Sequence, residues 1–160
     1  MNGKDIYLIL NNIRSAYNVG AIFRTADAAG VKKIFLCGIS PYPAENSQSE
    51  ITDKIGKTAL GAEKMVSWEK CKQTWRLMGK LKAEGVSLVA IEQTKNSKNI
   101  FKFKPIFPLA LVLGNEVRGL SKKILSYADK VVEIPMLGKK ESLNVSVAAG
   151  IALYQLKFGK

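Results

Sequence analysis

The sequence predicts an α/β domain built around a parallel sheet. Short apolar segments rich in β-forming residues alternate with helical patterns along the 160 residues, and the links between them are short. A strand–helix–strand run with short links favours a right-handed crossover and therefore parallel strands. Apolar residues make up 47% of the chain, enough for one substantial core, so a single domain over residues 1–160 is expected.

The N-terminal part carries the clearest strand–helix–strand unit. Residues 5–11 are apolar and β-rich, which predicts a buried strand. Residues 18–30 form a helical pattern, with Asn18 as a natural N-cap and Gly30 as a natural residue just beyond the C-terminus. A second apolar strand is expected over residues 31–38.

The middle of the chain carries weaker patterns. Two prolines and several polar residues predict a loop over residues 39–49, followed by a weakly periodic helix at 50–60. A short strand is expected at 64–68. Residues 69–84 show an amphipathic helical pattern that Gly85 ends.

Three more strands are expected in the C-terminal half, because apolar β-rich segments recur there. These strands cover residues 87–93, 109–114 and 130–136. A basic, polar link follows the first of them at 95–105, and a short helix near 122–127 separates the other two.

The last helix, expected over residues 144–158, is apolar around most of its circumference. Such a helix must be buried on several sides, and an open sheet covers only one of them. We therefore expect a homodimer that uses this helix, with Gly150 allowing close approach of a second helix.

The chain is strongly basic. Lys and Arg number 25 against 13 Asp and Glu, a formal net charge of +12. Such a surplus favours a polyanionic partner, above all nucleic acid. The alternative is a charge that serves solubility alone or reflects the bias of a proteome.

Several classes of protein are excluded or disfavoured. No apolar run of 18 residues occurs, and the first five residues lack an apolar signal core, so a cytoplasmic protein is expected. The absence of histidine excludes His-based acid–base chemistry and argues against most zinc catalysis. Cys37 and Cys71 fit no metal-ligand spacing.

Two polar segments follow apolar strands and suggest a site. Residues 115–121 come directly after one strand, and residues 142–146 come after the next. In open α/β sheets, ligands bind in the crevice outside the carboxyl ends of the strands. A binding site between these two segments is therefore expected.

These segments also carry a family resemblance. Residues 11–27 (NNIRSAYNVGAIFRTAD), 113–121 (LGNEVRGLS) and 134–150 (IPMLGKKESLNVSVAAG), together with 57–62 (KTALGA), appear in order over nearly the whole chain. In combination they resemble the SpoU (TrmH-like) branch of the SPOUT methyltransferases.

The resemblance implies a parallel-sheet SPOUT fold whose C-terminal part is tied in a deep trefoil knot. General topology rules would not suggest a knot, because true knots are rare. The resemblance also implies a homodimer, S-adenosylmethionine as cofactor, and methyl transfer to a ribose 2′-hydroxyl of tRNA or rRNA.

The family match assigns Arg24 to the step in which the weakly acidic ribose hydroxyl loses its proton. A guanidinium has no acceptor capacity, so an alternative is that Arg24 clamps an RNA phosphate, and the phosphate or a water takes the proton. A purely structural alternative is an Arg24–Asp27 pair on the helix surface. Asn18 either positions the ribose or Arg24, or only caps the helix.

Three more candidate catalytic residues lie in the two polar segments. Glu116 is expected to hold Arg24 or the RNA-facing side of the pocket; alternatively, it is a first-turn acid favoured by a helix dipole. Ser142 and Asn144 are candidates beside the last helix, and capping of that helix is the alternative.

By the same match, the cofactor is expected to lie against backbone groups and apolar side chains of the two loops. Gly114 would let it approach the backbone closely, and Asn115 is expected to order the first loop. The remaining candidates bracket the adenine and methionine parts: Ile134, Met136, Gly138 and Leu143.

Basic residues that flank these loops are candidates for RNA phosphate contact, although charges beside a turn are often merely solvated. They are Arg14, Arg118, Lys122, Lys139 and Lys140. No added RNA-binding domain is expected, which favours tRNA over rRNA as substrate. Two alternatives stay open: a SPOUT-type RNA base methyltransferase, which the 18–24 segment fits less well, and a non-catalytic RNA-binding protein.

Overall fold

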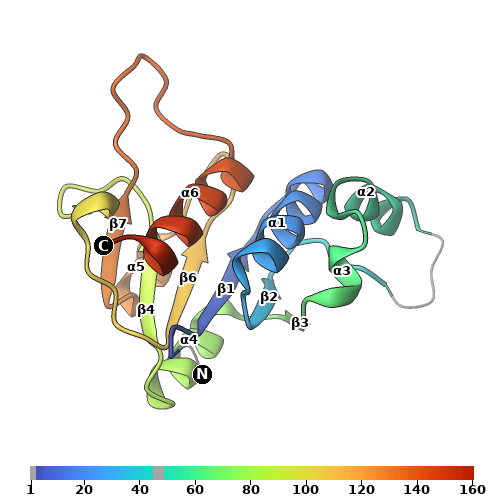
Figure 1. Cartoon of the computed structure of the whole chain (residues 1–160), viewed down its shortest axis with the longest axis horizontal. Coiled ribbons are helices and arrows are strands. Elements are labelled where there is room, and N and C mark those ends of the chain that lie inside the picture. The colour runs from blue at the N-terminus through green and yellow to red at the C-terminus, as the bar shows by residue number, and fades with distance from the viewer. Residues whose placement is uncertain (1–2, 45–48) are drawn as a thin grey trace.

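The computed structural model describes residues 3–44 and 49–160, and its centre is a parallel sheet (Figure 1). Within these residues the sheet has seven strands in the order β3-β2-β1-β6-β4-β7-β5, and every neighbouring pair is parallel. The strands are β1 (Ile6–Asn11), β2 (Lys33–Cys37), β3 (Trp68–Cys71), β4 (Ser87–Ile91), β5 (Lys98–Asn99), β6 (Leu109–Leu113) and β7 (Lys130–Glu133). The predicted parallel α/β class is confirmed.

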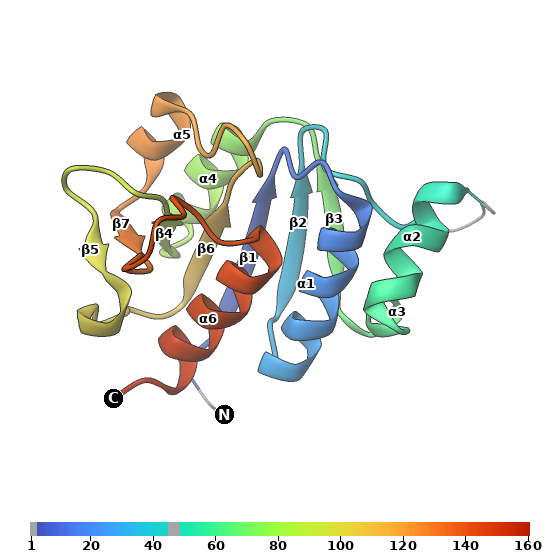
Figure 2. The same cartoon turned by 90° about the horizontal axis from the view of Figure 1, so that it is seen from above.

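Helices cover both faces of the sheet, as Figure 2 shows. One face carries α1 (Ala16–Ala29), α2 (Glu50–Ala59), α3 (Ala62–Met65) and α6 (Val145–Phe158), and the other carries α4 (Thr74–Ala83) and α5 (Lys122–Tyr127). A short 3-10 helix, η1 (Ile100–Lys102), follows β5 and contacts α6. None of the helices in the described residues is long and apolar enough to cross a membrane.

The central strands are apolar throughout because both of their faces are buried. All five residues of β6 are at most 1% exposed, and residues of β1 alternate between the two cores that the helices form on either side. This is the pattern that parallel strands covered on both faces require. Because β1, β6, β4 and β7 are neighbouring parallel strands, their carboxyl ends lie side by side along the same end of the sheet.

Helices α1 and α2 pack very closely at Gly20. A Cβ atom added there would overlap Thr58 Oγ1 and the carbonyl oxygen of Ile55, so only glycine fits. The Thr58 hydroxyl donates a hydrogen bond to the carbonyl of Tyr17 (2.8 Å), which ties the two helices together.

Several boundaries differ from the sequence prediction: the helix expected at 69–84 begins at Thr74, the strands expected at 87–93 and 130–136 end at Ile91 and Glu133, and the link at 95–105 contains β5 and η1. Helix α1 begins at Ala16 and is capped by Ser15, so the prediction of Asn18 as N-cap was wrong, whereas Gly30 ends the helix as expected. Residues 62–65 are helical, and the strand lies at Trp68–Cys71. Only Glu69 of this edge strand is exposed and the other three residues are half-buried, so the strand has no two-residue period that would separate it from the helical pattern that follows.

Helix α6 is buried on two sides. Its residues Ala149, Ala152, Leu153 and Leu156 are at most 2% exposed, facing the sheet and α1. Gly150 faces α1 of the same chain, where an added Cβ would lie an ordinary 3.6 Å from Thr25 Cγ2. A second apolar stripe remains exposed on α6; it consists of Val147 (49%), Tyr154 (46%) and Phe158 (61%).

Candidate active site

The carboxylate of Glu116 joins three segments that are far apart in the sequence. It accepts hydrogen bonds from the backbone N–H groups of Arg14 (2.9 and 3.1 Å) and Ser15 (3.1 Å), and from Asn18 Nδ2 (3.1 Å). Asn144 Nδ2 in turn donates to Asn18 Oδ1 (3.2 Å). The loops after β1, β6 and β7 are therefore held together by one polar network.

Burial and hydrogen bonding act in opposite directions on Glu116. Partial burial by itself raises the pKa of its carboxyl, but the N–H groups of Arg14 and Ser15 and the amide of Asn18 stabilise the charged form. The hydrogen bonds prevail, and the pKa of Glu116 lies below its ordinary value. Glu116 therefore works as an anionic clamp and not as a proton donor at neutral pH.

Asn144 both caps α6 and takes part in the network. Its Oδ1 accepts from the backbone N–H (2.9 Å) and hydroxyl (2.6 Å) of Ser146, while its amide nitrogen binds Asn18. Asn144 thus provides the cap that the sequence offered as one alternative and also holds Asn18 in place. Ser142 is exposed and lines the adjacent pocket.

Asn115 orders the loop that carries Glu116, as the sequence suggested. Its Oδ1 accepts from the N–H groups of Val117 and Arg118 (2.9 Å each), and its Nδ2 donates to the carbonyl of Asn12 (2.9 Å). Gly114 is required for this turn, because an added Cβ would lie 2.7 Å from the carbonyl carbon of Gly119.

Glu92 and Gln93 fix the two loops from β4, and sequence reasoning missed both. Glu92 Oε2 accepts from the N–H of Leu120 (2.9 Å), and Gln93 Nε2 donates to the carbonyl of Glu141 (2.6 Å). Their position directly after a buried strand is the feature that could have identified them, since the other polar site residues share it.

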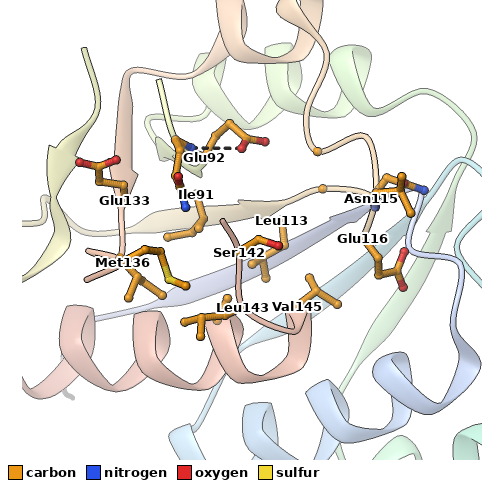
Figure 3. Close-up of a pocket in the computed structure, with 16 residues that line it drawn as sticks. Ile91, Glu92, Leu113, Asn115, Glu116, Glu133, Met136, Ser142, Leu143 and Val145 are labelled. Carbon is orange, nitrogen blue, oxygen red and sulfur yellow. Dashed lines mark hydrogen bonds between the residues drawn. The ribbon is translucent and has the colours of Figure 1, made fainter. Parts of the chain in front are cut away.

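Beside this network lies a pocket of about 170 Å³. In Figure 3 the side chains of Leu113, Met136 and Leu143 gather on one side of it, and Glu116 lies at the other end. All but one of the predicted cofactor-binding residues line the pocket: Gly114, Asn115, Ile134, Met136 and Leu143. The exception is Gly138, which is exposed in the loop that projects from the body of the molecule between β7 and α6 (Figure 1).

The walls of the pocket suit a flat, partly polar ligand. Apolar side chains from β4, β6, the β7–α6 loop and α6 form its sides, and carboxylate and amide groups lie at its rim. Within the described part of the chain, residues 135–143 form no hydrogen bond between backbone groups, and only the carbonyl of Glu141 is bound by a side chain, that of Gln93. Pairing with a ligand's polar edge would satisfy some of the remaining N–H and C=O groups.

Arg24 is exposed on α1 and makes no hydrogen bond or ion pair within the described residues. Arg24 therefore forms neither the contact with Glu116 nor the pair with Asp27 that the sequence suggested. Glu116 holds the backbone of the preceding loop instead.

The predicted RNA-contacting residues are all exposed, but they occupy different places. Arg14 and Arg118 flank the Glu116 network, and Lys122 begins α5. Lys139 and Lys140 lie in the projecting loop.

Comparison with known proteins finds similarity to RNA methyltransferases. Residues 5–154 match the model of the SpoU rRNA Methylase family. A tRNA (guanosine(18)-2′-O)-methyltransferase from Aquifex aeolicus is 37% identical over 152 residues, covering 95% of this chain and 68% of that protein. A 23S rRNA (guanosine-2′-O-)-methyltransferase from Vibrio parahaemolyticus is 33% identical and matches 94% of this chain but only 58% of its own length.

A solved structure shows the same fold. The AdoMet-bound rRNA methyltransferase from Sinorhizobium meliloti superposes with a TM-score of 0.82 at 26% identity, over 97% of this chain and 57% of that one. Because the family model covers nearly all of the sequence, the chain belongs to the SpoU rRNA methylase family.

Proposed function

We propose that this chain is an S-adenosylmethionine-dependent RNA ribose 2′-O-methyltransferase, with residues 5–154 as a single catalytic domain. The observation that carries the proposal is the network in which Glu116 and Asn144 both bind Asn18 beside an apolar pocket. Membership of the SpoU family and the named activities of the relatives support it.

S-adenosylmethionine would supply a methyl group on a positively charged sulfur, which needs no metal for activation. The apolar walls at Leu113, Ile134 and Leu143 suit the adenine ring, and the backbone groups of residues 135–143 other than the Glu141 carbonyl suit its polar edge. Gly114 lets the first loop fold closely on itself, because the backbone of Gly119 fills the space where a Cβ would stand.

The ribose hydroxyl must lose its proton as the new C–O bond forms and the C–S bond breaks with its electron pair going to sulfur. Because the Arg24 guanidinium is exposed and has five donors but no acceptor, we propose that it holds an RNA phosphate. The phosphate or a water then takes the proton. The Asn18 amide, fixed between Glu116 and Asn144, positions the sugar.

We further propose that the active form is a homodimer. The exposed stripe of Val147, Tyr154 and Phe158 on α6 supports this, since a contiguous apolar helix face is typical of a subunit interface. The Tyr154 and Phe158 rings already contact each other, with centroids 5.4 Å apart, so they offer a preformed surface.

We also infer a C-terminal trefoil knot. The path supports it: the chain crosses from β6 past β4 to β7, and α6 then returns to pack against β6, η1 and α1. Pulling on both ends would test it. A knotted chain extends to less than the roughly 3.3–3.6 Å per residue of a free chain, whereas full extension would exclude the knot.

Among RNAs we propose tRNA ahead of rRNA, and a cytoplasmic location with it. The tRNA enzyme from Aquifex aeolicus is matched over 68% of its length, whereas the rRNA enzyme from Vibrio parahaemolyticus has more unmatched sequence.

Nucleoside mass spectrometry tests the activity. The purified chain is incubated with labelled S-adenosylmethionine and with unfractionated tRNA or rRNA, and the RNA is then digested. We expect label in a 2′-O-methylnucleoside from tRNA. Label on a base indicates the base-methyltransferase alternative, and RNA binding without any label indicates a non-catalytic protein.

A further inference from the structure

A second, larger depression lies on the other side of the Glu116 loop. It has a volume of about 890 Å³ and is lined by the carboxyl ends of β1 and β2, the start of α4 and the loop that leads into α5. We call it the Trp75 groove, after the aromatic residue in its wall. Asn115, Val117 and Gly119 line both this groove and the first pocket, so one loop separates the two.

The groove is positively charged without compensation. Its ionisable lining residues are Arg14, Lys72, Arg118 and Lys123, and no acidic side chain lines it among the residues that the structure describes. All four cations are exposed, and none forms an ion pair within the described residues. Four unpaired cations around one groove favour an anionic occupant.

Trp75 adds an aromatic surface to these charges. The Nζ atom of Lys123 lies 4.3 Å from the Trp75 ring centroid, and the ring of Tyr127 packs at 6.2 Å with a 43° tilt. Lys123 is an exposed, flexible side chain, so a planar group can take its place on the ring. Aromatic rings beside Lys and Arg are the combination that binds single-stranded nucleic acid by stacking and charge.

The backbone of the groove favours an anion as well. Gln73, the N-cap residue of α4, makes no capping hydrogen bond with its side chain, so N–H groups of the first turn remain open. Arg14 links the groove to the site, because its own N–H is held by Glu116 (2.9 Å) while its side chain lines the groove.

We propose that the Trp75 groove binds an unpaired nucleotide of the substrate RNA next to the one that is methylated. Its base stacks on Trp75, while Lys72 and Lys123, the latter displaced from the ring, each pair with one phosphate. This inference rests on the proposed function, and it assigns substrate recognition to residues that the methyl-transfer site does not use.

The charges are tested with the double variant Lys72→Ala/Lys123→Ala. The matched control is Lys80→Ala/Lys130→Ala, which removes the same charge from exposed positions away from the groove. Binding of a fluorescent oligouridylate of about ten nucleotides is measured between about 50 and 200 mM salt. Losing two phosphate contacts on a single strand lowers the log–log salt slope by about 1.4, a roughly 25-fold loss of affinity near 0.1 M.

Stacking is tested by fluorescence of Trp75. The chain has two tryptophans, so Trp68→Phe leaves Trp75 as the sole reporter. We expect oligouridylate to quench its emission and poly-L-glutamate of equal charge not to do so. Equal quenching by both polymers would mean that the groove accepts acidic peptides, and it would overturn the assignment to RNA.

Methylation of bulk tRNA separates the inference from the function on which it rests. If the wild type methylates tRNA and the groove variant matches its control in affinity, salt slope and rate, the groove inference alone is wrong. If the wild type transfers no methyl group to any RNA although it binds oligouridylate through the groove, the proposed function fails, and with it the placement of the bound nucleotide beside a methylated one, whereas RNA binding by the groove stands.

Discussion

Replacing Glu116 by Gln removes a charge from the centre of the network without changing the size of the side chain. The carboxylate accepts from three donors: the N–H groups of Arg14 and Ser15 and the amide of Asn18. Oε1 accepts from all three donors and Oε2 accepts only from the N–H of Arg14, so a glutamine would place its NH2 donor against the Arg14 N–H and remove the charge that strengthens the other bonds. Hydrogen bonds to charged groups contribute about 1.5–3 kcal/mol each when buried. Because the site is partly open to water, which can replace a lost partner, we expect a total loss of about 1–2 kcal/mol.

Thermal unfolding followed by circular dichroism measures this loss. For a chain of this size, about 1–2 kcal/mol corresponds to a fall in Tm of roughly 2–8 °C. The matched control is Glu133→Gln, because Glu133 lines the same pocket but its carboxylate makes no hydrogen bond or ion pair within the described residues. We expect that control to melt within about 1 °C of the wild type.

The pH dependence gives a second readout with a definite sign. The pKa of Glu116 is lower in the folded protein than in the unfolded chain, so its charge stabilises the fold above the unfolded pKa, ordinarily about 4.3. That contribution is lost as the pH falls through the folded pKa. The difference in Tm between wild type and Glu116→Gln should therefore be full at pH 7 and shrink in acid. A difference that is absent at pH 7, or unchanged down to low pH, would refute the reasoning.

Three further outcomes follow from other parts of the molecule. The methyl group of Gly20→Ala overlaps α2, so this change should lower the free energy of unfolding measured with denaturant by about 1–3 kcal/mol. In the control Gly56→Ala the added Cβ makes only ordinary contacts, so the free energy of unfolding should not fall. Equal stability of the two variants would contradict the close packing of α1 and α2. Arg24→Ala should slow single-turnover methylation about a hundredfold or more with donor affinity unchanged, and a near-normal rate would exclude both roles considered for Arg24. Tyr154→Glu should convert a dimer to a monomer in sedimentation, and a monomeric wild type would contradict the interface on α6.

The central strands could be predicted from the sequence because burial on both faces requires a run of apolar residues. The long helices could be predicted from their periodic patterns and from the residues that end them. The strand β6 is five consecutive apolar residues, and α1 ends at Gly30 with the positive φ that glycine adopts readily. The β3–α4 region could not be assigned correctly. An edge strand of four residues, half exposed, has neither a clean two-residue period nor an apolar run.

The loops of the candidate site could be located from the sequence, but the partners within them could not. Glu116 and Asn18 are 98 residues apart in the sequence, and no local sequence pattern predicts the hydrogen bond between them. The expectation that Glu116 holds Arg24 was made on chemical type alone, and the structure gives Glu116 other partners. The Asn18 cap failed for a local reason: Ser15, three residues earlier, is an equally good cap, and its side chain accepts from the N–H of Asn18.

Calorimetric titration with S-adenosylmethionine tests the central claim most directly, namely that the pocket between the β6 and β7 loops holds the methyl donor. We predict one molecule bound per chain by the wild type, and loss of binding in Leu143→Glu, which places a carboxylate against the wall where the adenine ring is expected. Leu143 is 37% exposed, so the variant should still fold. No heat of binding with folded wild-type protein, or equal binding by both proteins, would contradict the account.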